Sequence, residues 1–301
     1  MQKLRISIVQ YLNTAPLVWG FTNGSLAGKY DLSFTVPSQC AEALRTGAAD
    51  IAIIPAIEYQ RILGLVVLPD LAIASQNRVR SLLIVSKKPI EQVRSVALDR
   101  SSRSTQALTR ILAAEHWKID PEFFEASPDL GAMLEKADAA LIIGDPALRV
   151  SVAVEKQSTV GPEGRAVCQT AALGMTGAGI FHLYDVVGEW RKLTGLPAVM
   201  AIWAARPEVV TPEVLADFTA SREFGLSQIA AISHEAAREL DLPQQALESY
   251  LRHNIDFSLS EENRRGLERY FQEAAKLGLI PRNEKIAWAN AAKEAARALA
   301  K

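Results

Sequence analysis

Two stretches of the chain, about 90 residues apart, follow the same order of predicted elements, and this repeat constrains the possible folds most. Residues 4–20 and residues 93–112 each run from an apolar strand through a polar loop into a helical segment. The spacing from Ile6 to Val96 is 90 positions. A repeat at nearly constant spacing indicates two similar α/β units within one chain.

The second half of each unit is repeated as well. Residues 40–62 and residues 129–150 both contain a helix, a turn, an aspartate and an apolar strand, with Asp50 and Asp138 standing 88 positions apart. The strands IAIIP and AALIIG are short and continuously apolar. Such strands are typical of parallel sheets that helices cover on both faces.

Further apolar strands lie on either side of the middle unit, within residues 79–90 and residues 195–210. A strand on each side of the middle unit predicts a two-lobe protein in which the chain passes twice from one lobe to the other. One lobe is expected from residues 1–86 together with residues 200–301, and the other from residues 87–199. The predicted fold class is α/β, with a mostly parallel sheet flanked by helices in each lobe.

The composition argues against several classes of protein. With 33 basic and 34 acidic residues the net charge is −1, so a nucleic-acid partner is not expected. No run of about 18 apolar residues occurs, so no membrane-spanning helix is expected. The first residues, MQKLRISIVQYLN, lack the apolar region and cleavage site of a signal peptide, which predicts a cytoplasmic protein. The sequence does not indicate an oligomeric state.

Metal and disulfide chemistry are not expected either. Cys40 and Cys168 stand far apart without CxxC spacing, which favours a reduced, structural pair. The four histidines lack the paired spacing of a zinc site, so no metal ligand is predicted.

The loop after the strand at residues 96–98 carries four hydroxyl side chains and an arginine, although one N-cap satisfies a helix. In open α/β sheets, ligands bind at the carboxyl ends of strands, where helix N-termini favour anions. The hydroxyl groups and the arginine that the cap does not need predict a binding site for a carboxylate or a phosphate. A capped helix with solvated serines is the alternative. The residues concerned are Ser101, Ser102, Arg103, Ser104 and Thr105.

Four further positions are candidates for the same site. Tyr11, Asn13 and Thr14 follow the first strand. Asn13 and Thr14 could cap the next helix, and in the alternative the Asn13 amide faces the cleft. Ser81 lies at the start of a strand between the units, where a bond to backbone is the alternative role. Asp145 is either a site residue or the N-cap of the helix after its strand.

These segments resemble a known family. The stretches SIVQYLNTAPLVWG, GAADIAIIPAIEY, VRSLLIVS, ALDRSSRSTQALTRIL, ADAALIIGDPAL, GEWRKLTGLPAVMAIWAARP and YFQEAAKLGLI together resemble the chorismate dehydratase family of the futalosine route to menaquinone. That family is similar in fold to type II periplasmic binding proteins but works as a cytoplasmic enzyme. The resemblance implies a hydro-lyase that needs no cofactor. It implies chorismate, a small dicarboxylate, as substrate, and 3-[(1-carboxyvinyl)oxy]benzoate and water as products.

The family pattern marks the asparagine of YLN and the serine of VRS as active-site residues, which correspond to Asn13 and Ser81. A neutral amide is too weakly basic to take a proton from carbon unaided. We therefore expect Asn13 to orient or polarise the substrate and Ser81 to donate to a carboxylate. A carboxylate of the substrate is the expected proton acceptor, with Asp145 as the weaker candidate.

Two other functions remain open at the level of sequence. The related 1,4-dihydroxy-6-naphthoate synthase resembles this chain in architecture, but its first junction carries a different motif from YLNTAP. A non-catalytic binding protein for small carboxylates has the same expected fold, and export would distinguish it from an enzyme.

Overall fold

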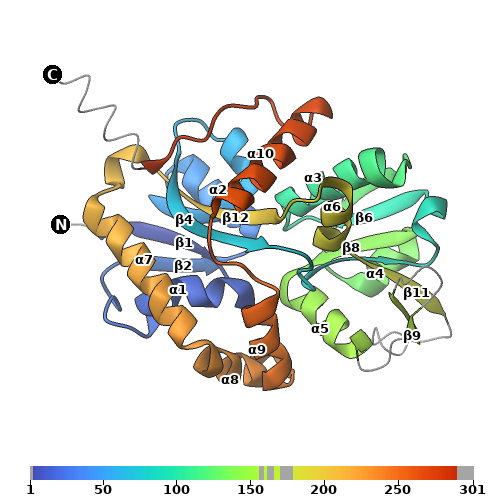
Figure 1. Cartoon of the computed structure of the whole chain (residues 1–301), viewed down its shortest axis with the longest axis horizontal. Helices are drawn as coiled ribbons and strands as arrows, with labels where there is room; N and C mark the ends of the chain where they lie inside the picture. Colours follow the sequence, from blue (N-terminus) through green and yellow to red (C-terminus); the bar gives the residue numbers. More distant parts are fainter. Residues whose placement is uncertain (1–2, 156–158, 161–165, 170–178, 290–301) are drawn as a thin grey trace.

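The computed structural model describes residues 3–155, 159–160, 166–169 and 179–289, and it shows two lobes side by side, each built around one sheet (Figure 1). The sheet of the first lobe has the order β2-β1-β3-β12-β4, and that of the second lobe β7-β6-β8-β5-β11-β10-β9. The strands of the first sheet are β1 (Arg5–Val9), β2 (Asp31–Thr35), β3 (Ile51–Pro55), β4 (Val66–Ser75) and β12 (Ala198–Ala205). The strands of the second are β5 (Leu82–Ser86), β6 (Ser95–Asp99), β7 (Glu122–Ala126), β8 (Ala139–Ile143), β9 (Thr159–Val160), β10 (Ala166–Gln169) and β11 (Ile180–Asp185).

Helices cover both sheets, and the helices after β12 pack on the first lobe (Figure 1). Short 3-10 turns, η1 (Leu12–Thr14) and η2 (Ala56–Gln60), follow β1 and β3. The α-helices are α1 (Ala15–Thr22), α2 (Pro37–Thr46), α3 (Arg103–Ile111), α4 (Leu130–Lys136), α5 (Gly144–Glu155), α6 (Val186–Thr194), α7 (Pro212–Ser227), α8 (Ile229–Leu240), α9 (Gln244–His253) and α10 (Glu261–Lys276).

The predicted repeat is confirmed by the strand order. The sequence β2-β1-β3-β12-β4 in the first sheet corresponds position by position to β7-β6-β8-β5-β11 in the second. In each sheet the first three strands are parallel, and the crossing strand, β12 or β5, pairs antiparallel with its neighbours. Both sheets are therefore mixed, and the expected parallel pairing is limited to three strands in each lobe. The reason is that each crossing strand enters from the other lobe.

The chain passes between the lobes after β4 and again between α6 and β12. The division expected after residue 86 falls at the end of β5, which pairs with β8 and β11 in the second sheet. The first crossing is therefore the segment 76–81, which comes before β5. Ser81 lies at the end of this crossing.

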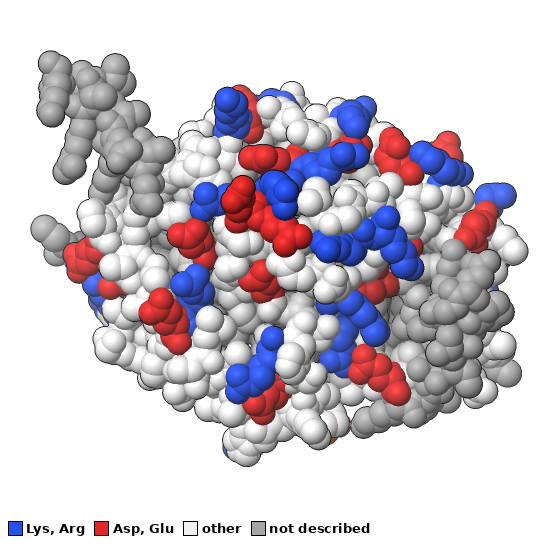
Figure 2. All heavy atoms as spheres, viewed as in Figure 1, with Lys and Arg blue, Asp and Glu red and all other residues white. Residues whose placement is uncertain are grey.

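The continuously apolar strands form the centre of each lobe. All five residues of β3 and of β8 are buried, as expected for strands covered on both faces. Cys40 and Cys168 are both buried and are not joined to each other by a disulfide. Acidic and basic side chains are interspersed over one face of the molecule, in line with the balanced charge (Figure 2).

Within the described residues, no helix is long and apolar enough to cross a membrane. The same part of the chain contains no cluster of three or more His, Cys, Asp and Glu side chains arranged to hold a metal ion.

Candidate active site

The loop after β1 brings Asn13 to the N-terminal end of α1 without using it as a cap. Thr14 occupies the N-cap position, and its side chain makes no capping hydrogen bond. Instead, Thr14 Oγ1 donates to Asn13 Oδ1 over 3.4 Å. The capping alternative is therefore wrong for Asn13 and Thr14. Asn13 remains only partly buried.

Ser81 is fully buried, and its hydroxyl contacts a side chain that the sequence analysis did not single out. Tyr250 Oη in α9 donates to Ser81 Oγ over 2.8 Å, and Ser81 contributes only its carbonyl to a backbone bond, from Gly144 N at 2.8 Å. The alternative in which the Ser81 hydroxyl bonds backbone is wrong. Tyr250 follows Leu247 by three residues on an apolar helix face, so the sequence pattern makes it look like an ordinary core residue.

Asn13 also affects the phenol of Tyr250. Burial raises the pKa of Tyr250, and hydrogen bonds with Ser81 and Asn13 oppose this rise. Asn13, Ser81 and Tyr250 thus form one polar group at the boundary of the lobes, which we name the inner cluster. It consists of neutral hydrogen-bonding groups, and such groups suit an anion that must lose its water.

The corresponding loop of the second lobe follows β6. Ser101 donates from its backbone N and from its Oγ to Asp99 Oδ1, over 2.9 and 2.6 Å. Burial raises the pKa of the Asp99 carboxyl, and the two bonds from Ser101 oppose that rise. The Ser101 carbonyl accepts from Ser38 N of α2, so this loop contacts the first lobe.

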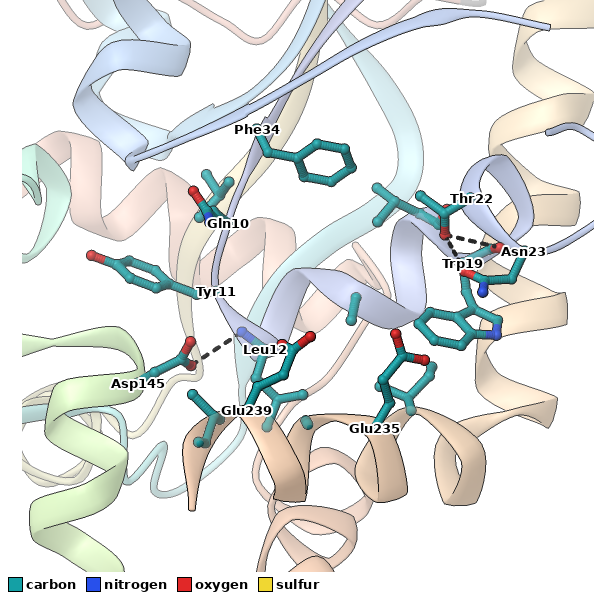
Figure 3. Close-up of a pocket in the computed structure, with 16 residues that line it drawn as sticks. Gln10, Tyr11, Leu12, Trp19, Thr22, Asn23, Phe34, Asp145, Glu235 and Glu239 are labelled. Atoms are coloured by element: carbon teal, nitrogen blue, oxygen red, sulfur yellow. Dashed lines mark hydrogen bonds between the residues drawn. The ribbon is translucent and has the colours of Figure 1, made fainter. Parts of the chain in front are cut away.

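Tyr11 from the first lobe contacts the residues that follow β6 and β8 in the second lobe. Its Oη lies 3.5 Å from Ser101 Oγ. Its ring also lies against Gly144, where a Cβ atom would come within 2.7 Å of Tyr11 Cζ and where φ is +67°. Only glycine combines this backbone angle with so close an approach. Next to it, Asp145 Oδ1 accepts from Leu12 N over 3.1 Å (Figure 3), so Asp145 joins the two lobes and is not the predicted N-cap.

The other polar residues of the second loop have partners within the protein. Ser102 Oγ donates to Thr105 Oγ1 over 2.8 Å, Ser104 Oγ accepts from Ile57 N over 3.1 Å, and Arg103 pairs with buried Glu58 over 3.0 Å. The hydroxyls are buried, and Ser102 at the N-cap position makes no capping bond, so the alternative of a capped helix with solvated serines is wrong. Arg103 and Ser104 therefore attach α3 to η2 of the first lobe.

An open pocket of about 480 Å³ lies between α1 and α8, and Asn13, Ser81 and Tyr250 are not among its lining residues (Figure 3). Tyr11, Leu12 and Asp145 line it together with Glu235 and Glu239, which point into it from α8. Three carboxylates in one pocket repel an anionic ligand. A dicarboxylate is therefore better accommodated by the neutral donors of the inner cluster.

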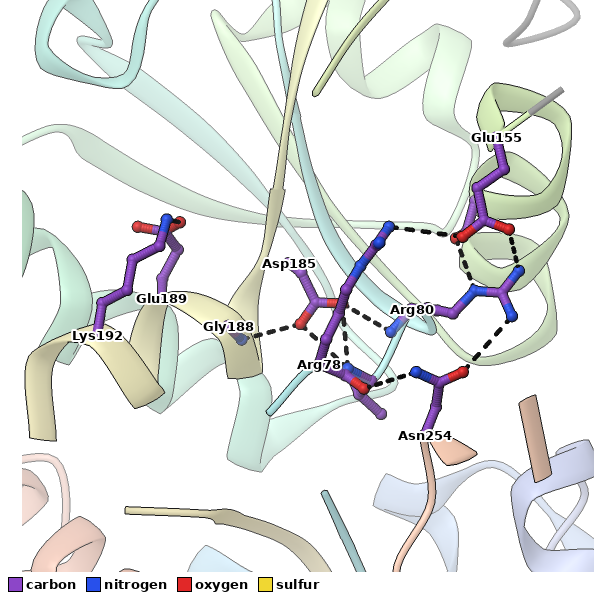
Figure 4. Close-up of polar contacts among 10 residues, drawn as sticks. Arg78, Arg80, Glu155, Asp185, Gly188, Glu189, Lys192 and Asn254 are labelled. Carbon is purple, nitrogen blue, oxygen red and sulfur yellow. Dashed lines mark hydrogen bonds and ion pairs between the residues drawn. The ribbon is translucent and has the colours of Figure 1, made fainter. Parts of the chain in front are cut away.

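Charged residues hold the crossing segment that leads to Ser81 (Figure 4). The Asp185 carboxylate accepts from Val79 N and from Arg80 N, the latter over 2.7 Å. Arg80 itself is in a left-handed conformation, with φ of +65°, and its guanidinium contacts Glu155 and Asn254. This conformation is uncommon for a residue with a side chain, and here the contacts on both sides maintain it. These contacts fix the backbone direction of the segment that leads to Ser81.

The bond between Asp145 and Leu12 gives an expected pH dependence. Burial raises the pKa of Asp145 from 3.8 to about 6. Because the folded-state pKa is raised, its contribution to stability is fully present below pH 3.8 and is lost as the pH rises through about 6. We expect Asp145→Asn, which keeps an oxygen for Leu12 N, to melt a few degrees above wild type at pH 7.5. At pH 4 the difference should vanish. Melting curves of both proteins at the two pH values test this, and an equal difference at both would contradict it.

Comparison with known proteins assigns the chain to a family. A family model described as menaquinone biosynthesis matches residues 4–276, a range that spans both lobes. The chain belongs to this menaquinone-biosynthesis family. It is also 28% identical, over 285 residues, to a chorismate dehydratase of Thermus thermophilus. That alignment covers 93% of this chain and 98% of the relative.

Solved structures place this member of the menaquinone-biosynthesis family among the periplasmic-binding-protein-like folds. A protein of Archaeoglobus fulgidus matches with a TM-score of 0.67 and 17% identity, covering 92% of this chain and 98% of that one. The aliphatic sulphonate binding protein of Escherichia coli matches with a TM-score of 0.59 and 18% identity, covering 94% and 90%. These likenesses concern the fold, and they confirm the predicted two-lobe architecture.

Proposed function

We propose that this protein is a chorismate dehydratase, which converts chorismate into 3-[(1-carboxyvinyl)oxy]benzoate and water in the futalosine route to menaquinone. It acts in the cytoplasm as a hydro-lyase without a cofactor. The family match and the nearly full-length similarity to the Thermus thermophilus chorismate dehydratase support this proposal. The observation that carries it is that Asn13 and Ser81, which are 68 positions apart in the sequence, both act on Tyr250: Ser81 Oγ accepts from the phenol over 2.8 Å, and both residues lower the pKa that burial raises.

The reaction removes the C3 proton and the C4 hydroxyl of chorismate. The C3–H electron pair becomes a ring double bond, the C4–O bond breaks, and the hydroxyl leaves as water once it has gained a proton. The product ring is aromatic, which supplies the driving force. The protein then needs only to position the substrate, to donate hydrogen bonds to oxygens that gain charge, and to exclude water.

The inner cluster offers the groups for these tasks. Asn13 orients or polarises the substrate with its amide, and Ser81 donates from its hydroxyl to a substrate oxygen. The proton acceptor is a carboxylate of the substrate. Since the Asp145 carboxylate already accepts from Leu12 N, its role as acceptor is the weaker option.

We assign the binding of the substrate carboxylates to the two loops that meet between the lobes. Tyr11 and Thr14 contribute from the first lobe. The residues of the second lobe are Ser101, Ser102, Arg103, Ser104 and Thr105. Asp145, itself a carboxyl group, belongs to the same substrate site as the weaker candidate for the proton acceptor. Since most of these side chains already have partners, those partners must be exchanged or shared when substrate binds.

The decisive experiment incubates the purified protein with chorismate and follows the loss of the diene absorbance and the mass of the product. We expect an aromatic enol ether to form without added metal or nucleotide, and at the same rate with a chelator present. Unchanged chorismate after hours at micromolar enzyme would contradict the proposal. Binding of chorismate without turnover would instead support a binding protein for small carboxylates.

A further inference from the structure

The direction of the hydrogen bonds in the inner cluster can be deduced from the number of protons available. A phenol carries one proton, and Tyr250 gives it to Ser81 Oγ over 2.8 Å. Any further hydrogen bond at the Tyr250 oxygen must then be one that it accepts. Asn13 is a polar neighbour that lowers the pKa of this phenol.

The other end of Asn13 is already used. Asn13 Oδ1 accepts from Thr14 Oγ1 over 3.4 Å, so the amide nitrogen is the end of Asn13 that can donate to a neighbour or to a ligand.

The Ser81 hydroxyl keeps a proton of its own. Ser81 Oγ receives the Tyr250 proton, and its backbone carbonyl is occupied by Gly144 N. The Ser81 O–H is therefore directed away from Tyr250, and among the described residues no acceptor for it is found. Without the phenol, the hydroxyl of Ser81 could rotate and act as an acceptor as well as a donor.

We propose that Tyr250 is a positioning residue of the dehydration, which acts through Ser81 by making its hydroxyl a fixed donor to the substrate. This inference rests on the proposed function. Tyr250 comes from α9 of the first lobe, whereas Ser81 lies at the end of the crossing between the lobes. The bond between them thus holds the Ser81 hydroxyl in one position relative to Asn13.

Tyr250→Phe removes the phenol oxygen and keeps the ring. We expect kcat for chorismate to fall roughly 10- to 100-fold, since a donor that is misplaced in the transition state has about this effect. KM should change less than about threefold, because the carboxylate contacts assigned to the two loops are kept and the Ser81 hydroxyl is still present. Steady-state kinetics separate these two parameters.

Tyr184→Phe is the matched control. Tyr184 is also buried, and its phenol oxygen accepts from the Ile90 backbone N over 2.9 Å, away from the inner cluster. Each variant loses at least one buried hydrogen bond, so both should melt a few degrees lower. Only Tyr250→Phe should lose kcat. Equal kcat in the two variants would overturn the proposal.

A double-mutant cycle tests whether Tyr250 acts through Ser81. In the Ser81→Ala background, Tyr250→Phe should lower single-turnover rates by less than about threefold, because the group it orients is gone. A loss as large as in the wild-type background would overturn the inference. Turnover by the wild-type protein tests the proposed function separately. An active wild type with an equally active Tyr250→Phe variant would refute only the role of Tyr250.

Discussion

The Asn13→Ala protein is expected to lose at least about 100-fold in chorismate turnover, because removing one positioned hydrogen-bonding group near a developing charge has this effect. Its melting temperature should stay close to that of wild type, since Asn13 is only partly buried and caps no helix. Ser81→Ala is expected to show a similar loss of turnover. The measurements are kcat with chorismate and a thermal melt for each variant.

Asn23→Ala provides the control for this prediction. Asn23 is the same residue type at the opposite end of α1, where it is exposed and lies outside the inner cluster. It should turn over chorismate at the wild-type rate. Normal turnover by Asn13→Ala would remove Asn13 from the proposed active site.

The second large effect is expected on stability, at the contact between α1 and α7. A Cβ atom on Gly225 would lie 2.0 Å from the carbonyl oxygen of Pro16, so Gly225→Ala must push the two helices apart. Overpacking of this kind costs about 1–3 kcal/mol, which exceeds the gain of up to about 1 kcal/mol from alanine in a helix. We expect a clear decrease in the free energy of unfolding, measured by urea denaturation.

Gly131→Ala in α4 is the matched control, because the nearest atom to its Cβ would be Asp129 Oδ1 at 3.5 Å. This variant should be as stable as wild type or slightly more stable. Equal free energies of unfolding for the two alanine variants would contradict the prediction, because α1 and α7 would then be able to separate without a loss of stability. Since Pro16 lies three residues after Asn13, Gly225→Ala should also reduce turnover.

The repeat has a direct consequence for the site. Tyr11 and Ser101 are 90 positions apart, the same spacing as Ile6 and Val96, so they occupy equivalent positions after β1 and β6. They meet across the lobe boundary at 3.5 Å. Equivalent strand ends of two similar sheets therefore face each other, and a site between them receives residues from both copies.

The sequence by itself determined the strands, the helices and the number of lobes. Apolar periodicity is a local property, and residues 4–20 carry the same pattern as residues 93–112. The family resemblance added Asn13 and Ser81 as active-site candidates. The sequence did not determine whether each polar residue caps a helix, bonds backbone or lies in the site.

Only the tertiary structure decided those roles, because they depend on partners that are distant in the sequence. Asp145 binds Leu12 N across 133 positions, and Ser81 binds Tyr250 across 169. Arg103 and Ser104, for which the sequence predicts an anion site, contact η2 of the other lobe in the structure. A local pattern shows that a side chain is polar, but its hydrogen-bond partner is fixed only when both lobes pack together.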